Sequence, residues 1–206
     1  RNFLSKNKHY LLKTRGVPGT HDIDLIYKML RQINKKKFNK IILPKFDKSI
    51  DDRIKKNQWQ KLTKKPDIII LEGWCVGAKA QSDVLLKKPV NDLEKFEDPN
   101  LIWRKYVNKL LRTNYKKLFN KMNGIIYLKA PSFSLLKKWR FKQEKKLKFK
   151  NRFKKNLKIM SYLQILRFMM FYQRITLQMF KDLPKAADVI LHLNEKHRIK
   201  KIQYNT

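Results

Sequence analysis

Short runs of branched apolar residues predict the strands of this chain. Each run is almost continuous in Ile, Val and Leu and is bounded by charged or turn-forming residues. A strand that is covered on both faces of a parallel sheet has this composition, because neither of its faces meets water. The predicted strands are residues 40–43, 67–71, 124–128 and 189–193.

Apolar residues at intervals of three and four predict helices between these strands. The segment 22–32 repeats its apolar side chains in this way, and either Thr20 or Asp22 can serve as its N-cap. Alternating strands and helices are typical of an α/β protein with a parallel sheet flanked by helices. The other predicted helices are residues 101–122 and 162–180, from their apolar spacing, and residues 132–148, which follow Pro131 and begin with Ser132 as a cap.

The length and composition favour one domain, residues 1–206, with 42% hydrophobic residues for its core. No apolar run approaches the roughly 18 residues that a membrane span needs. A single cysteine, Cys75, can form no disulfide within the chain, which is typical of a reducing compartment. We therefore expect a cytoplasmic protein with no membrane partner. Because the first residue is Arg1 rather than Met, we also expect a processed chain or a fragment.

The net charge of +35 has two explanations. One is a polyanionic partner such as nucleic acid. The other is a lysine-rich codon bias, and we favour it because the lysines are spread along the chain and arginine clusters are absent. We expect nonspecific binding to polyanions at low salt and no specific nucleic-acid partner. The most basic stretch, within residues 139–158, is either a lid or a solvated helix surface.

The first chemistry-bearing loop reads RGVPGTHD and covers residues 15–22. Its Gly and Pro residues predict a tight turn that feeds the helix predicted at 22–32. Amide groups at a helix N-terminus attract anions, and Arg15 and His21 can contact the same anion directly. The alternative is a purely structural turn with Thr20 as its cap.

The second loop reads LPKFDKSIDDR and follows the strand predicted at 40–43. Ligands of open parallel sheets bind beyond the carboxyl ends of the strands. Asp47, Lys48 and Arg53 would lie at that rim, where they either bind a hydroxylated acid or pair with one another on the surface.

The third loop reads IIILEGWCVGA and covers residues 68–78. A strand of bulky residues that ends in an acid resembles a Walker B segment, whose carboxylate holds Mg²⁺ beside the transferring phosphate. Glu72 stands at that position, although it can equally be an ordinary charge at a strand end. Trp74 and Cys75 either line a pocket or serve packing only.

These three segments, in this order, resemble the D-glycerate 3-kinase family and its close kinase-like relatives. That family belongs to the P-loop kinases related to uridine kinase and phosphoribulokinase. The resemblance continues at residues 91–94, 97–99, 103–104, 106–108, 130–133, 139–140, 143–144, 171–174, 183–184, 187–188 and 197.

The resemblance implies a P-loop NTPase-like fold, with ATP and Mg²⁺ as cofactors. It also implies a reaction in which ATP phosphorylates a small hydroxy acid, D-glycerate giving 3-phosphoglycerate. Members of the family carry a Walker A loop ahead of the segment matching Arg15. The five glycines of this sequence never fall in Walker A spacing. We therefore expect an N-terminally truncated chain that lacks the first strand and P-loop unit, with activity in a full-length form.

The site residues follow from the loops and the resemblance together. Glu72 is the expected acid on the Mg²⁺ side, holding the ion directly or through water, and Asp47 is the second expected catalytic group. Arg140 is either a lid cation that reaches the phosphates or a surface residue. The expected substrate contacts are Arg15, His21, Lys48 and Arg53.

Two alternative functions remain open at this stage. The charge is compatible with a basic nucleic-acid-binding module. A degenerate kinase relative without catalysis is compatible with the lack of a Walker A loop in this sequence.

Overall fold

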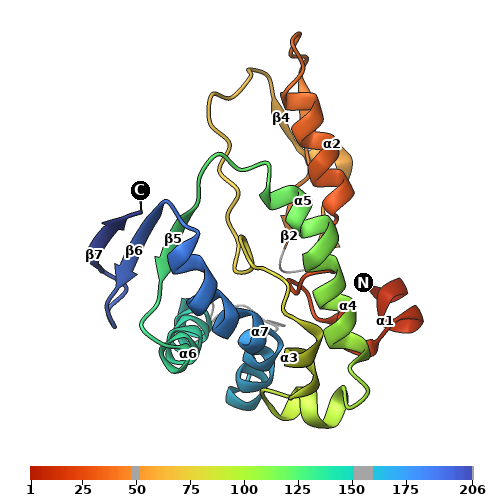
Figure 1. The fold of residues 1–206 in the computed structure, drawn as a ribbon. Helices are drawn as coiled ribbons and strands as arrows, with labels where there is room; N and C mark the ends of the chain where they lie inside the picture. Colours follow the sequence, from red (N-terminus) through yellow and green to blue (C-terminus); the bar gives the residue numbers. More distant parts are fainter. Residues whose placement is uncertain (48–51, 151–159, 206) are drawn as a thin grey trace. The chain divides into compact units, whose positions relative to one another are not determined.

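Helices and short strands alternate along the chain in the computed structural model, which describes residues 1–47, 52–150 and 160–205 (Figure 1). The fold is therefore mixed α/β, as the sequence predicts. The described residues divide into two compact units. The first unit comprises the described parts of 1–21, 73–153 and 159–206, and the second comprises those of 22–72.

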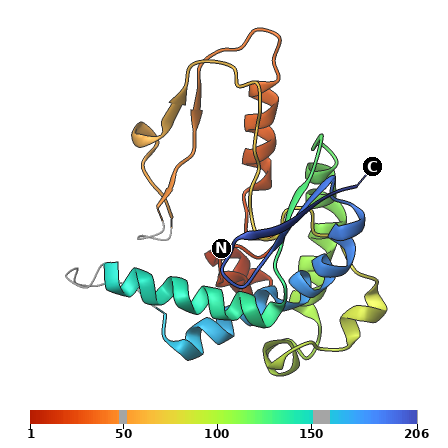
Figure 2. The ribbon, with the colours of Figure 1, turned by 90° about the vertical axis from the view of Figure 1, so that its left-hand side faces the viewer.

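The first unit contains a three-stranded sheet. Strands β5 (Ile126–Lys129) and β6 (Val189–Leu193) pair in parallel, and β7 (Ile199–Tyr204) pairs antiparallel with β6. The three strands lie side by side in both ribbon views (Figures 1 and 2). The strand predictions at 124–128 and 189–193 are confirmed. Strand β7 was not predicted, because its sequence IKKIQY carries two adjacent lysines and lacks a continuous apolar run.

Helices α6 (Phe133–Lys150) and α7 (Tyr162–Asp182) run alongside each other in the first unit (Figure 2). Their contact includes a buried cluster of Phe133, Ile165 and Met169. Ser161 and Gln164 form a reciprocal capping box that begins α7. Both helices confirm the predictions at 132–148 and 162–180. Among the described residues, no helix combines the length and the apolar character needed to cross a membrane.

The remaining helices of the first unit are short. The helix predicted at 101–122 is a succession of α-helical and π-helical turns. The elements are α1 (Asn2–Asn7), η1 (Tyr10–Lys13), α3 (Asp83–Lys87), η3 (Leu93–Glu97), α4 (Ile102–Leu110), η4 (Leu111–Tyr115), α5 (Lys116–Phe119) and η5 (Leu183–Lys185).

The second unit combines one helix with two pairs of strands. Asp22 caps helix α2 (Ile23–Ile33), because its carboxylate accepts a hydrogen bond from the Leu25 amide at 3.1 Å. Strand β1 (Ile41–Leu43) confirms the strand predicted at 40–43, but it pairs antiparallel rather than in a parallel sheet. Its partner is β4 (Gln60–Leu62); the other elements are β2 (Phe46–Asp47), which pairs with β3 (Asp52–Arg53), and η2 (Lys56–Gln58).

The strand predicted at residues 67–71 is wrong for this structure. The segment is extended chain outside any strand, and Ile68 and Ile70 are 78% and 84% exposed. An apolar run shows which residues can be buried, but a strand also needs a hydrogen-bonding neighbour. No strand in the described part of the chain pairs with this segment.

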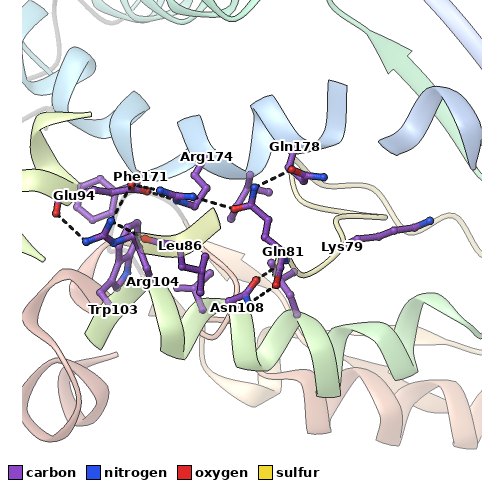
Figure 3. Close-up of a pocket in the computed structure, with 13 residues that line it drawn as sticks. Lys79, Gln81, Leu86, Glu94, Trp103, Arg104, Asn108, Phe171, Arg174 and Gln178 are labelled. Carbon is purple, nitrogen blue, oxygen red and sulfur yellow. Dashed lines mark hydrogen bonds and ion pairs between the residues drawn. The ribbon is translucent and has the colours of Figure 1, made fainter. Parts of the chain in front are cut away.

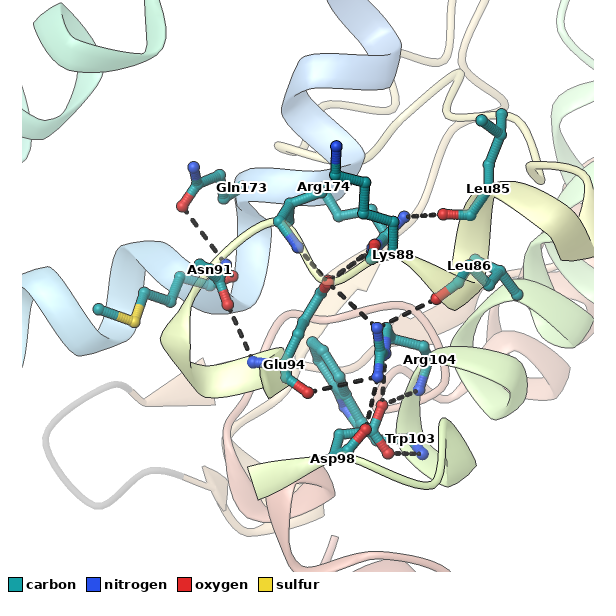
Figure 4. Close-up of polar contacts among 12 residues, drawn as sticks. Leu85, Leu86, Lys88, Asn91, Glu94, Asp98, Trp103, Arg104, Gln173 and Arg174 are labelled. Carbon is teal, nitrogen blue, oxygen red and sulfur yellow. Dashed lines mark hydrogen bonds and ion pairs between the residues drawn. The ribbon is translucent and has the colours of Figure 1, made fainter. Parts of the chain in front are cut away.

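Four buried charges connect α7 to the segments before and within α4 (Figure 4). The Glu94 carboxylate, 0% exposed, accepts hydrogen bonds from Arg174 Nε at 2.7 Å and Nη2 at 2.6 Å. The Asp98 carboxylate, 1% exposed, accepts one from Arg104 Nε at 2.8 Å. Two carboxylates therefore balance two guanidinium groups in a site that water does not reach.

Backbone groups satisfy the remaining hydrogen-bonding capacity of this network. Arg174 donates to the Leu85 and Lys88 carbonyls at 2.9 and 2.6 Å, and Arg104 donates to the Leu86 carbonyl at 3.0 Å. The Val90 amide donates to Glu94 at 2.9 Å. Because these partners lie in the short helix α3 and in the turn that follows it, the network holds that segment against α4 and α7.

Glu94→Gln tests this network, because it removes one buried charge and preserves the side-chain shape. An unbalanced guanidinium charge remains, and the amide turns a donor toward it. We expect the free energy of unfolding to fall by about 3–5 kcal/mol, measured by denaturant unfolding.

The matched control is Asp83→Asn. Asp83 pairs with Arg112 at 3.0 Å on the surface, where both side chains are more than half exposed. This substitution should cost about 1 kcal/mol or less. Equal losses in the two variants would contradict a special role for the buried charges.

Candidate functional site

The loop from Arg15 to His21 belongs to the first unit and depends on two glycines. Gly16 and Gly19 have φ of 91° and 98°, a conformation that favours glycine. A Cβ atom on Gly16 would lie 2.5 Å from the Tyr172 hydroxyl, and one on Gly19 would lie 2.7 Å from Leu110 Cδ1. The loop backbone therefore packs directly against α4 and α7.

Tyr172 on α7 holds the start of this loop. Its hydroxyl donates to the Arg15 carbonyl at 2.6 Å, and its ring stacks on Trp74 with centroids 4.9 Å apart. The Trp74 indole is itself fixed, because it donates to Thr176 Oγ1 at 2.9 Å. Trp74 thus packs against and orients Tyr172.

Two cationic side chains lie close enough to Tyr172 to act on its hydroxyl. Burial raises the pKa of Tyr172, and the Cys75 thiol adds to this, whereas the charges of Arg15 and Arg140 oppose it. Arg140 comes from α6, where it donates to Glu144 Oε2 at 2.8 Å and lies over the Phe168 ring at 5.5 Å. The Phe168 ring lies 5.1 Å from the Tyr172 ring, so two residues with cationic side chains, Arg15 and Arg140, flank Tyr172 from distant parts of the sequence, which suits an anionic ligand.

His21 closes the loop against a second buried tyrosine. Its Nδ1 lies 2.7 Å from the Tyr115 hydroxyl oxygen, and the Gly19 amide donates to the same oxygen at 2.9 Å. Although the residue has an exposed side, burial of its ring lowers the pKa of His21. The imidazole is therefore neutral at neutral pH.

Cys75 is a packing residue rather than a nucleophile. Its buried thiol points toward the Gly16 carbonyl, with Sγ and O 4.0 Å apart. Burial raises the pKa of this thiol to about 12, so the reactive thiolate is not formed at neutral pH.

The other expected site residues belong to the second unit. Asp47 is half-buried in β2, opposite Asp52 in β3. Arg53 pairs with Asp22 through Nη1 and Oδ2 at 3.1 Å, so its charge is engaged by the last residue of the first loop rather than by an acid of its own loop. Glu72 is exposed. Lys48 lies outside the described residues, as do residues 151–158 of the basic segment at 139–158.

The structure brings Arg15, His21 and Arg140 together in one unit, and it places Asp47, Arg53 and Glu72 on the other. That both groups serve one cleft stays a prediction. The two tyrosines of the site were not predicted. Tyr172 falls within the family-like motif at 171–174 and could have been suspected, whereas Tyr115 has no signal in the sequence.

The expected metal site was compared with the acidic residues that the structure describes. No group of three or more His, Cys, Asp and Glu residues in the described chain could hold a metal by itself. Mg²⁺ in phosphoryl-transfer enzymes needs only one or two carboxylates, with phosphate oxygens and water as its other ligands. The exposed carboxylate of Glu72 fits that requirement.

A separate small cavity lies between α4 and α7 (Figure 3). Its polar walls are already engaged with each other: Asn108 and Gln81 exchange two hydrogen bonds, at 2.8 and 3.0 Å, and Arg174 donates to Gln81 at 3.1 Å. Trp103 Nε1, also in its wall, has no partner in the described residues. This cavity belongs to the buried charge network and not to the site around Tyr172.

Comparisons with curated proteins find kinases. The chain is 29% identical over 153 residues to the uncharacterized kinase mug58 of Schizosaccharomyces pombe. The aligned residues cover 70% of this chain and 54% of that protein. It is 28% identical over 140 residues to the chloroplastic D-glycerate 3-kinase of Arabidopsis thaliana, covering 65% of this chain and 28% of that protein. Over 79 residues it is 42% identical to the probable ATP-dependent kinase TDA10 of Saccharomyces cerevisiae, covering 32% of this chain and 25% of that one. The chain thus matches about half the length of the first relative and about a quarter of the other two. No protein-family profile matches the chain.

Two solved structures share the fold of this chain. The D-glycerate 3-kinase of Cryptococcus neoformans matches with a TM-score of 0.76 at 23% identity, over 98% of this chain and 72% of that one. The YGR205w protein matches with a TM-score of 0.71 at 25% identity, over 98% and 71% of the two chains. Both comparisons thus confirm the resemblance of this chain to the D-glycerate 3-kinases and their kinase-like relatives.

Proposed function

We propose that the protein is an ATP-dependent kinase that phosphorylates a hydroxyl group of a small acid, with D-glycerate giving 3-phosphoglycerate as the first candidate reaction. The proposal applies to the form of the protein that carries a Walker A loop, within a P-loop NTPase-like parallel sheet. The observation that carries it is that Tyr172 holds the Arg15 carbonyl on one side and packs against Phe168, the ring under Arg140, on another, in a chain that resembles kinases.

The geometry of the first unit supports a division of roles. Phosphoryl transfer depends mainly on positioning and on neutralising negative charge. Arg15, held through its carbonyl by Tyr172, contacts the carboxylate of the acid, and His21 adds a neutral polar contact. Arg140 acts on the transferring phosphate; its guanidinium is held by Glu144 on α6 and lies over the Phe168 ring, which packs against Tyr172.

The second unit supplies the acidic groups in this proposal. Asp47 orients the hydroxyl that attacks the phosphate, with Lys48 and Arg53 as further contacts to the acid. Glu72 would hold Mg²⁺, directly or through water, and the ion would neutralise charge on the nucleotide phosphates.

A turnover assay tests the proposed reaction. The complete product of the gene, supplied with Mg²⁺, ATP and D-glycerate, should release ADP and form 3-phosphoglycerate. Coupled detection of ADP measures the rate, and ³¹P NMR identifies which hydroxyl carries the phosphate.

The other results of this assay have separate meanings. Turnover with a different hydroxy acid would show that the assigned substrate is wrong, but the protein would still be a kinase. Absence of turnover with hydroxy acids, nucleosides and pantothenate alike would contradict the proposal that the protein is an enzyme. It would favour a non-catalytic relative of the kinases.

Substitutions of the two arginines should separate their roles. Arg15→Met should raise KM for the acid roughly 10- to 100-fold with little change in kcat, because it removes a charge-assisted hydrogen bond to the substrate. Arg140→Met should instead lower kcat by a similar factor, because its charge acts on the transferring phosphate. Steady-state kinetics with both substrates varied measures the two effects.

Arg112→Met is the control for these variants. Arg112 is exposed in the same unit and pairs with Asp83 at 3.0 Å, away from Tyr172. It should leave both constants unchanged. Losses of equal size in all three variants would mean that only the overall charge matters and would contradict the assigned roles.

A further inference from the structure

The Tyr115 hydroxyl joins two parts of the loop that carries Arg15 and His21. It receives a hydrogen bond from the Gly19 amide at 2.9 Å and lies 2.7 Å from His21 Nδ1. Tyr115 itself is buried in η4, and its ring meets the imidazole edge-on at 5.9 Å.

Counting donors determines the direction of the bond between Tyr115 and His21. A neutral imidazole carries one ring proton, on either Nδ1 or Nε2. If Nδ1 carried it, the Tyr115 oxygen would accept from both sides, and its own buried hydroxyl proton would have no acceptor in the described contacts. If Nδ1 is bare, the hydroxyl proton goes to it and the Gly19 amide still donates to the oxygen. Only the second arrangement satisfies every buried donor.

We propose that Tyr115 is a positioning residue that holds His21 in the tautomer with its proton on Nε2, so that His21 presents a neutral N–H donor to the substrate. This inference rests on the proposed function for the identity of the recipient, a carboxylate or hydroxyl oxygen of the small acid. It assigns His21 the role of a hydrogen-bond donor and excludes it as the base that deprotonates the attacking hydroxyl, because its only unprotonated nitrogen faces Tyr115.

The exposure of the two residues fits this arrangement. Tyr115 is buried, whereas His21 retains an exposed side. The bond between them occupies Nδ1 and leaves Nε2 for a ligand. A tautomer fixed before the ligand arrives avoids the reorganisation that a freely exchanging imidazole would need.

Nitrogen NMR measures the tautomer without any turnover. In the ¹⁵N-histidine-labelled chain at about pH 8, where an ordinary imidazole with a pKa of about 6.5 is neutral, the signals of His21 are those that disappear in His21→Gln. We expect a protonated Nε2 and an unprotonated Nδ1. Tyr115→Phe should move both shifts toward the average of the two tautomers. A protonated Nδ1 in the unmodified chain would overturn the inference.

Steady-state kinetics of the complete gene product tests whether the tautomer of His21 affects KM for the acid. Tyr115→Phe should raise KM for the acid about twofold to tenfold, the size of one hydrogen bond, with little change in kcat. Glutamine offers an N–H donor near the position of Nε2 but has no tautomers. In the His21→Gln background, Tyr115→Phe should therefore change KM no further.

An effect of Tyr115→Phe that persists in full in the His21→Gln background would overturn the inference, because it would mean that Tyr115 acts only through the loop backbone. Tyr106→Phe is the matched control. The Tyr106 ring also lies against Gly19, and its hydroxyl makes no hydrogen bond within the described residues. It should change neither the shifts of His21 nor KM. If no acid is phosphorylated by the complete protein, the proposed function fails, and the NMR result still decides the tautomer.

Discussion

The buried pairing of Glu94 and Asp98 with Arg174 and Arg104 is the constraint on which the first unit depends. Charges that are removed from water must be matched closely, and here every carboxylate accepts at least one guanidinium hydrogen bond of 2.6–2.8 Å. The same guanidinium groups donate to backbone carbonyls of the short helix α3 and of the residue that follows it. The position of α7 is therefore set by electrostatics as well as by apolar packing.

The network and the candidate site are connected through α7. Tyr172 and Arg174 are two residues apart, so they point to nearly opposite sides of the helix, about 200° apart. Arg174 is held by the buried carboxylates, and Tyr172 on the other side holds the Arg15 carbonyl and stacks on Trp74. The loop that presents Arg15 is thus attached to the most tightly satisfied part of the unit, which explains how a glycine-rich turn can hold a defined geometry.

Local patterns in the sequence predict the long helices of this fold. They do not predict which apolar segments become strands, because a strand also needs a neighbouring strand to pair with. Helices α2 and α7 form as predicted because their apolar stripes and caps are local features, and α6 begins beside Ser132, whose Oγ accepts a hydrogen bond from the Leu135 amide at 3.1 Å. The run at 67–71 has the composition of a strand but no strand beside it in the described residues. The segment before α4 is held by buried ion pairs, which apolar periodicity does not reveal. At the site, glycines and charges identified the loop with Arg15 and His21, whereas Tyr115 is reached only through tertiary contacts.

The central claim is that Arg15 and its surroundings bind a small acid. Calorimetric titration of D-glycerate into the 206-residue chain, at an ionic strength of about 0.15 M to screen nonspecific attraction, tests it without any nucleotide. We expect saturable binding of one molecule per chain that Arg15→Met abolishes and Arg112→Met leaves intact. Binding that is equal in the unmodified chain and Arg15→Met, or the absence of binding in both, would contradict it.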